Sequence, residues 1–111
     1  MLVGRSAADN DHLTFGVAKG RDLWLHVAGG TPGSHVVIRN PDGADVPREV
    51  VRQAAQLAAY YSKARNARRV EVHCCRAADV SKPRGMPPGK VLIKRFDKLK
   101  VEPSRLEADE A

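Results

Sequence analysis

The sequence predicts an α+β domain in which one long helix packs on a mainly antiparallel β-sheet. Short segments of the first half alternate apolar and polar residues, and a central segment repeats apolar residues at helical spacing. Alternation then returns in the last third of the chain. Because 111 residues suit one hydrophobic core, we expect one domain over residues 1–103, followed by an acidic, disordered tail over residues 104–111.

Three strands are expected before the helix, over residues 12–17, 23–27 and 34–39. In the first, Leu13 and Phe15 alternate with polar neighbours, which would place both side chains on one face. The third is rich in β-branched residues, which favour strands. Glycine-containing turns separate the three segments, as expected for neighbouring antiparallel strands.

The helix is expected after the turn at residues 40–43. Asp45 can cap it, and Pro47 suits its first turn, where a missing N–H costs little. One apolar stripe follows at spacings of three and four, formed by Val50, Ala54, Leu57, Tyr61 and Ala64. The remaining strands are expected over residues 70–75 and 91–96, with residues 99–101 as an extension.

Basic residues are concentrated in the second half of the chain. The formal net charge is +6, but residues 63–100 hold twelve Lys or Arg against three Asp or Glu, a net charge of +9. This asymmetry indicates a polyanionic partner, either nucleic acid or an anionic membrane surface, with a generally basic surface as the simpler alternative. No apolar run approaches the roughly 20 residues of a transmembrane helix. The first residues also lack the apolar stretch of a secretory signal, so we expect a cytoplasmic protein without a membrane partner.

The two cysteines, Cys74 and Cys75, are neighbours in the sequence. A disulfide between adjacent residues would be strained, so we expect reduced thiols, with Cys74 in the core and Cys75 on the more exposed face. His73 and more distant histidines add candidate zinc ligands. However, consecutive strand residues point to opposite faces, and the sequence has no Cys-x-x-Cys pair. We therefore expect neither a metal site nor a cofactor.

The densest group of chemically versatile side chains lies in the second and third expected strands. Asp22, Trp24 and His26 share the face opposite the apolar one, and Ser34 and His35 follow a glycine-rich loop. A catalytic interpretation would make Ser34 the nucleophile, a histidine its base and Asp22 the orienting acid, but no nucleophile elbow is present. A phosphate-binding P-loop does not fit either, because its lysine is absent and a strand follows the glycines. A framework role for Asp22, Trp24 and His26 is the alternative to a binding pocket.

Residues 22–26 (Asp-Leu-Trp-Leu-His) and 32–38 (Pro-Gly-Ser-His-Val-Val-Ile) together resemble the signature of the NFACT-R domain. That domain is the RNA-binding module of ribosome-quality-control factors and of fibronectin-binding-like bacterial proteins. The resemblance extends to about Pro103 through Gly4-Arg5, Asn10-Asp11, residues 54–65 and residues 80–91.

The chain departs from the family pattern in two respects. Its loop at residues 28–31 is glycine-rich, where relatives more often carry charged or bulky residues, so its contacts should differ. The full-length factors also carry an N-terminal NFACT domain, helix-hairpin-helix elements and coiled coils, none of which fits in this chain. We expect a stand-alone copy if Met1 is the natural start and an excised domain otherwise, and the tail-synthesis role of those factors is not implied.

The resemblance implies an RNA-binding protein that is not an enzyme, with tRNA or rRNA as its partner and a place at the large ribosomal subunit. Phosphate contacts are expected from Arg5, Lys63, Arg65, Arg68, Lys82 and Arg84. Further RNA contacts are expected from Asn10, Asp22, Trp24, His26, Ser34 and His35. Trp24 and one of Tyr60 or Tyr61 would stack on an unpaired base. Two alternatives stay open: an adaptor whose basic face meets an acidic protein, and a small hydrolase or nucleotide-modifying enzyme using Asp22, His26 and His35.

Overall fold

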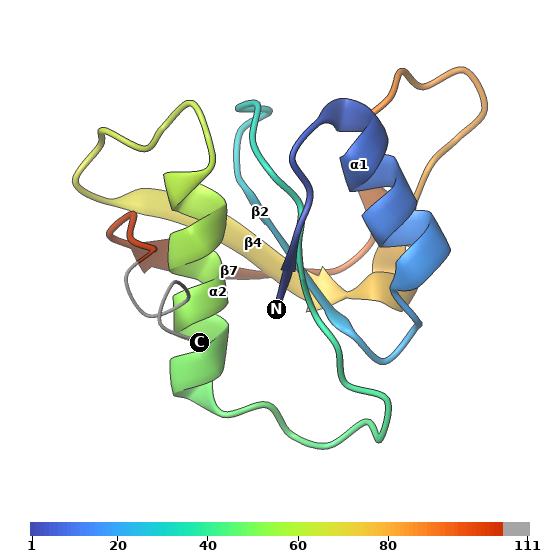
Figure 1. Cartoon of the computed structure of the whole chain (residues 1–111), viewed down its shortest axis with the longest axis horizontal. Helices are drawn as coiled ribbons and strands as arrows, with labels where there is room; N and C mark the ends of the chain where they lie inside the picture. The colour runs from blue at the N-terminus through green and yellow to red at the C-terminus, as the bar shows by residue number, and fades with distance from the viewer. Residues whose placement is uncertain (106–111) are drawn as a thin grey trace.

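The computed structural model describes residues 1–105 and places helices against both faces of a five-stranded sheet (Figure 1). The strands lie in the order β1-β3-β2-β4-β7, and every neighbouring pair is antiparallel. Their bounds are β1 Leu2–Val3, β2 Leu23–Val27, β3 Val36–Ile38, β4 Val70–Arg76 and β7 Asp97–Val101. The predicted α+β class with a mainly antiparallel sheet is confirmed.

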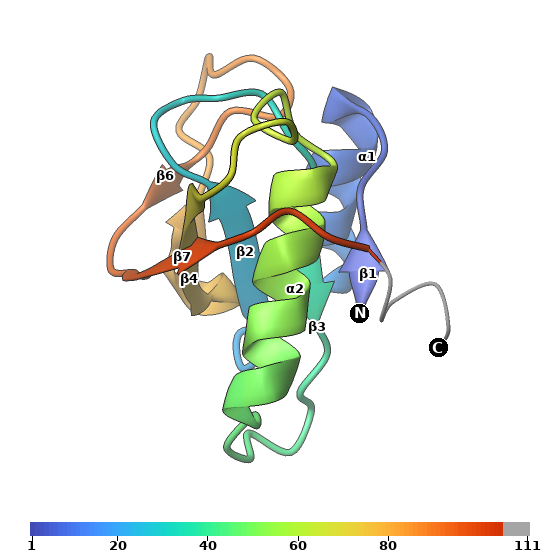
Figure 2. The same ribbon diagram turned by 90° about the vertical axis from the view of Figure 1, so that its left-hand side faces the viewer.

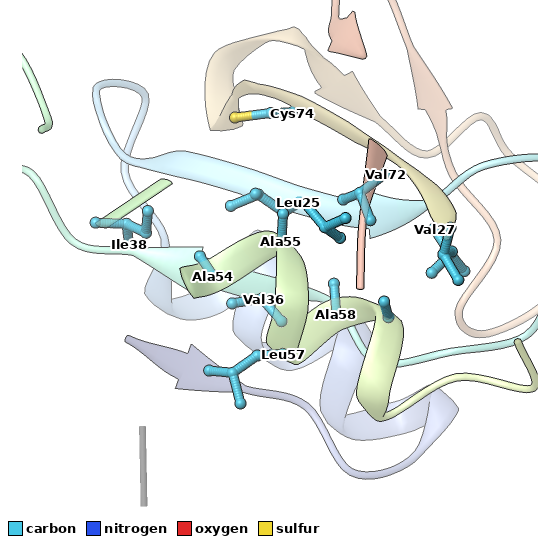
Figure 3. Close-up of a cluster of buried hydrophobic side chains, with 13 residues drawn as sticks. Leu25, Val27, Val36, Ile38, Ala54, Ala55, Leu57, Ala58, Val72 and Cys74 are labelled. Carbon is cyan, nitrogen blue, oxygen red and sulfur yellow. The ribbon is translucent and has the colours of Figure 1, made fainter. Parts of the chain in front are cut away.

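Helix α2 (Arg48–Tyr60) covers one face of the sheet and forms the main core with it (Figure 2). Leu25 on β2 lies opposite Val36 on β3 and Cys74 on β4, so these three side chains share the covered face. The helix meets them with Leu57 and with small alanine side chains such as Ala55, which allow it to approach the strands closely (Figure 3).

The opposite face is covered by α1 (Ala7–Asp11), which continues directly into η1 (His12–Val17), a π-helical segment. Ser6 caps α1 by accepting a hydrogen bond from the Asp9 N–H at 3.0 Å. At the other end, the Ala18 N–H donates to the Leu13 carbonyl, five residues back, as in a π-turn. The side chains buried beneath these helices form a second core of Leu13, Trp24, Val37, Cys75 and Val80.

The predictions of a strand at residues 12–17 and of one long helix are therefore wrong. Leu13 and Phe15 alternate in the sequence, but the buried residues are Asn10, Leu13 and Thr14, at the three- and four-residue spacing of a helix. Phe15 is 44% exposed. The alternation of apolar residues therefore does not decide the local structure. The Ser6 cap favours a helical start, and the helical stripe buries its apolar side chains against the second face of the sheet.

Helix α2 is also shorter than expected and ends at Tyr60, a length of 13 residues. The backbone turns away because residues 61–63 pair with the loop at residues 32–34. The Ser34 N–H donates to the Tyr61 carbonyl at 3.0 Å, and the Lys63 N–H donates to the Pro32 carbonyl at 2.9 Å. Pro47 lies at the N-cap position, and among the described residues no side chain caps the helix start, so the expected Asp45 cap is not formed.

Of the expected strand at residues 91–96, only β6 (Leu92–Ile93) forms. It pairs with β5 (Val80–Ser81), which directly follows the short helix η2 (Ala77–Asp79). Most of the predicted acidic tail, residues 106–111, lies outside the described residues, so its disorder stays a prediction. Within residues 1–105, no helix is both long enough and apolar enough to cross a membrane.

Candidate nucleic-acid interface

A groove of about 800 Å³ is lined by three loops and by the residues at the start of α1. The backbone of these loops gathers at one end of the sheet, near the start of α1 (Figure 2). The loops are residues 28–34, residues 60–65 and the segment from Pro88 to Phe96. Within residues 1–105, four cationic side chains line the groove, those of Arg5, Lys63, Arg65 and Lys90. Of the residues that the structure describes, no Asp or Glu lines it. A groove with cations and no carboxylates focuses a positive potential, which attracts polyanions.

The floor of the groove is a row of aromatic rings on the α1 side of the sheet. Trp24 and His26 are stacked with ring centroids 5.9 Å apart, and His35 meets both rings edge-on at 5.0 and 5.2 Å. His26 on β2 lies opposite His73 on β4, and the His73 ring stacks on Phe96 at 4.1 Å. The row thus runs from the buried second core to the exposed rim.

His35 is held in this row by side chains from α1 and η1. The Trp24 indole N–H donates to Thr14 Oγ1 at 3.1 Å, and that hydroxyl lies 2.8 Å from His35 Nδ1. Asn10 Oδ1 accepts from the His35 N–H at 3.0 Å, while Asn10 Nδ2 donates to the Gly33 carbonyl at 3.2 Å. These bonds fasten the first helical segment to the loop that forms the groove wall.

A small residue is required where the backbone comes close to its neighbours. A Cβ at Gly4 would collide with the Asn10 side-chain oxygen, and a Cβ at Gly33 would lie 2.7 Å from Ser62 Cβ. In contrast, Gly29 and Gly30 have φ values of 75° and 71°, and a Cβ added to either would meet no atom within 4 Å. These two glycines leave open backbone on the rim of the groove.

Two of the groove's histidines, His26 and His35, are neutral at pH 7. Burial, together with the neighbouring His26, lowers the pKa of His35 to about 4. Burial likewise lowers the pKa of His26. The positive charge of the groove therefore comes from its lysine and arginine side chains, while the imidazoles supply flat rings and hydrogen-bonding nitrogens.

Part of the groove lining combines tyrosines with arginines. Tyr60 and Tyr61 meet edge-on at 5.1 Å. The guanidinium carbon of Arg5 lies 4.8 Å from the centre of the Tyr61 ring, and that of Arg65 lies 5.6 Å from the centre of the Tyr60 ring. These contacts hold two of the groove's cations beside the tyrosine rings.

The structure brings together eight of the twelve predicted RNA-contacting residues. The groove is lined by Arg5, Asn10, Trp24, His26, Ser34, His35, Lys63 and Arg65. Within this group, only 2% of Trp24 is exposed, so the prediction that its ring stacks on a base does not fit the structure. Ser34 is also buried, and its N–H bonds to Tyr61.

Asp22 lies outside the groove and has a framework role. Its fully buried carboxylate accepts from Arg39 Nε at 2.7 Å and from the N–H groups of Asn40 at 2.6 Å and Lys19 at 2.9 Å. Burial raises its pKa, but these donors lower it more, so the pKa lies below its usual value. Asp22 therefore joins the ends of β2 and β3, and the structure does not bring it together with Ser34 as the catalytic interpretation requires.

Lys82, Arg68 and Arg84 also lie outside the groove lining. The Lys82 ammonium donates to the carbonyls of Pro87 and Lys90, both at 2.7 Å, and lies 3.3 Å from Asp11 Oδ1. Lys82 thus closes the loop that forms one side of the groove. Arg68 and Arg84 are exposed.

Both cysteines are buried thiols on opposite faces of β4, one in each core. Burial raises the pKa of Cys74 to about 11 and that of Cys75 to about 12. The prediction for Cys74 is confirmed, whereas the prediction that Cys75 is more exposed is wrong, because the second core covers it. Within residues 1–105, no group of three or more His, Cys, Asp or Glu is placed to hold a metal ion.

Among the described groove residues that the predicted RNA contacts omit, three add a cation, an imidazole or a phenyl ring to the groove: Lys90, His73 and Phe96. The available signal was the segment Lys94-Arg95-Phe96, which places an aromatic ring beside two basic residues. His73 reaches the groove only because β4 pairs with β2, which the spacing of residues along the chain does not reveal.

Comparison with known proteins gives a consistent family. The model of the family described as NFACT protein RNA binding domain matches residues 1–95. The chain is 45% identical over 104 residues to the Rqc2 homolog RqcH of Streptococcus suis, and 41% identical over 89 residues to that of Bacillus subtilis. The matches cover 94% and 80% of this chain but only 18% and 15% of those proteins.

Among solved structures, the chain is similar to the C-terminal part of the fibronectin/fibrinogen-binding protein from Streptococcus suis. The TM-score is 0.88 and the sequences are 42% identical. The match covers 98% of this chain and 43% of the other.

Proposed function

Because this chain belongs to the family of NFACT protein RNA binding domains, we propose that it binds RNA, specifically tRNA or rRNA, in the groove. The observation that carries this proposal is the convergence of Arg5, Lys63, Arg65 and Lys90 on a groove whose described lining holds no carboxylate. Phosphates placed along such a groove displace counterions, and this release favours binding.

The relatives suggest a setting for this activity. The relatives from Streptococcus suis and Bacillus subtilis are both named Rqc2 homolog RqcH, and the chain spans less than a fifth of the length of each. We propose that the chain supplies RNA contacts in ribosome quality control, in the cytoplasm and near the large ribosomal subunit. It would do so without catalysing a reaction itself, so any chemistry in that process would come from other proteins.

Binding to purified tRNA and to duplex DNA of similar length, measured at several salt concentrations, tests the proposal. The double variant Lys63→Gln/Arg65→Gln removes two groove cations. The matched control, Arg48→Gln/Arg52→Gln, removes two exposed arginines of α2 that do not line the groove. Affinity falls as salt rises, and the groove variant should make this fall less steep. The magnitude of the slope of log affinity against log salt should decrease by about 1.4, at roughly 0.7 per lost phosphate contact with unpaired RNA.

Preferential binding of tRNA, with a reduced slope in the groove variant alone, supports the proposal. Equal and weak binding of both nucleic acids would contradict it and would favour an acidic protein as the partner of the basic face. If both double variants reduce binding equally, the groove is not the specific RNA interface.

A further inference from the structure

Phe96 is the most exposed of the aromatic rings that line the groove within the described part of the chain, at 40%. It lies between β6 and β7, and one side of its ring stacks on His73, with a centroid distance of 4.1 Å and an angle of 29° between the rings. We propose that the Phe96–His73 pair is a stacking platform for a single unpaired base of the bound RNA. This inference rests on the proposed RNA binding and specifies the form of RNA that the groove accepts.

The platform is held in position before any ligand binds. His73 belongs to β4, whose strand partners at this position are His26 on β2 and Lys98 on β7. Its Nε2 atom lies 3.0 Å from a carboxylate oxygen of Glu71 on the same strand. Because the His73 ring is fixed by the sheet and by this contact, the Phe96 ring stacked on it loses little additional freedom when a base binds.

The surroundings of Phe96 favour a base over an apolar partner. Phe96 shares the groove with Lys90 and Lys63. The two residues before it, Lys94 and Arg95, are also basic, and the residue after it, Asp97, is acidic and does not line the groove. An apolar protein segment would have to desolvate such cations without pairing them, which is costly. A nucleotide offers a flat ring for the platform and a phosphate for the cations in the same unit.

The platform also selects for RNA that is not paired. Within a double helix, neighbouring bases cover both faces of each base, so a protein ring gains access only to a base in a loop, a bulge or a single strand. Trp24 cannot take this role because it is buried in the second core. We therefore assign to Phe96 the stacking role that the sequence predicts for Trp24.

A short single-stranded RNA carrying one 2-aminopurine, compared with its fully paired duplex, tests the inference, since 2-aminopurine fluorescence is quenched on stacking. Three variants are needed. Phe96→Ala removes the platform, Phe96→Tyr keeps a ring of similar size, and Phe15→Ala removes a phenylalanine of similar exposure outside the groove. Circular dichroism of each variant establishes that the fold is retained.

We expect Phe96→Ala to bind the single strand about tenfold more weakly and to abolish the fluorescence quenching, because one stacked base contributes an effect of this order. The slope of affinity against salt should be unchanged, since no cation is lost. Phe96→Tyr and Phe15→Ala should behave like the parent, and duplex binding should be the same in all four proteins.

If the parent binds RNA but Phe96→Ala binds the single strand equally well, the stacking inference is wrong and the proposed function stands. A fall in duplex affinity as large as the fall in single-strand affinity would also overturn the preference for unpaired RNA. If the parent binds neither RNA at any salt concentration, the proposed function itself fails, and the inference fails with it.

Discussion

Acidification should destabilise this protein through His35, which is 1% exposed and sits beneath the groove. Its pKa is about 4 in the folded chain and 6.5 in the unfolded chain. The folded state therefore favours the neutral imidazole, and the unfolded chain takes up a proton first as the pH falls. The contribution of His35 to the free energy of unfolding is fully present above pH 6.5 and is lost as the pH falls from 6.5 to about 4. Below that pH, this group causes no further loss.

The size of the loss follows from the shift in the pKa. Each pKa unit corresponds to about 1.4 kcal/mol, so His35 should lower the free energy of unfolding by about 3 kcal/mol across this interval. His26, which faces His35 at 5.2 Å, has a lowered pKa and acts in the same direction. The pKa of Asp22 is also lowered, but a carboxyl group with a lowered pKa stabilises the fold above its unfolded value of 3.8, so this contribution is lost only at more acidic pH.

Urea unfolding at a series of pH values between about 7.5 and about 4 measures this loss as a change in the free energy of unfolding. His35→Gln should be less stable at neutral pH, because the bond to Thr14 is altered, but its stability should depend less on pH. The control His12→Gln removes an exposed imidazole of η1 and should keep the acid dependence of the parent. A titration of the His35 ring by NMR with a midpoint near the unfolded value of 6.5, or an unchanged acid dependence in His35→Gln, would refute the reasoning.

Two further predictions concern the construction of the groove. Gly33→Ala should lower the free energy of unfolding by about 1–3 kcal/mol, because the new Cβ would lie 2.7 Å from Ser62 Cβ and 3.2 Å from Ser62 Cα. Urea unfolding measures this loss, and a variant as stable as the parent would show that the loop at residues 32–34 shifts freely. Lys82→Met should speed hydrogen exchange at the Gly89 N–H, which donates to Asp11 Oδ1, without changing exchange in β2. The exposed Arg84→Met in the same loop serves as its control, and equal exchange in both variants would contradict the role of Lys82 in closing the loop.

The role of Lys82 changes how charge variants of this loop should be interpreted. From the sequence alone, Lys82 and Arg84 are equivalent candidates for phosphate contacts. In the structure, Lys82 bonds to two carbonyls and a carboxylate, so its replacement would alter the groove wall as well as the charge. Lys63 and Arg65 are better probes of RNA binding, because both are exposed and line the groove.

The α+β class, the strands at residues 23–27 and 70–75, the presence of a central helix and the family could all be predicted from the sequence. These features depend on local periodicity, on turn residues and on an ordered set of motifs, all of which can be read along the chain. The basic character of the second half is equally a property of composition.

Packing between distant segments determines what residues 12–17 form, which aromatic ring reaches the surface and which cation is structural. Leu13 and Thr14 are buried as parts of a helix because a face of the sheet has to be covered. His73 meets Phe96 and Lys82 meets Asp11 through contacts between segments that are separated in the sequence. Local periodicity reports the spacing of neighbours along the chain, whereas burial and pairing depend on which segments lie against each other, and that is set only when the whole chain folds.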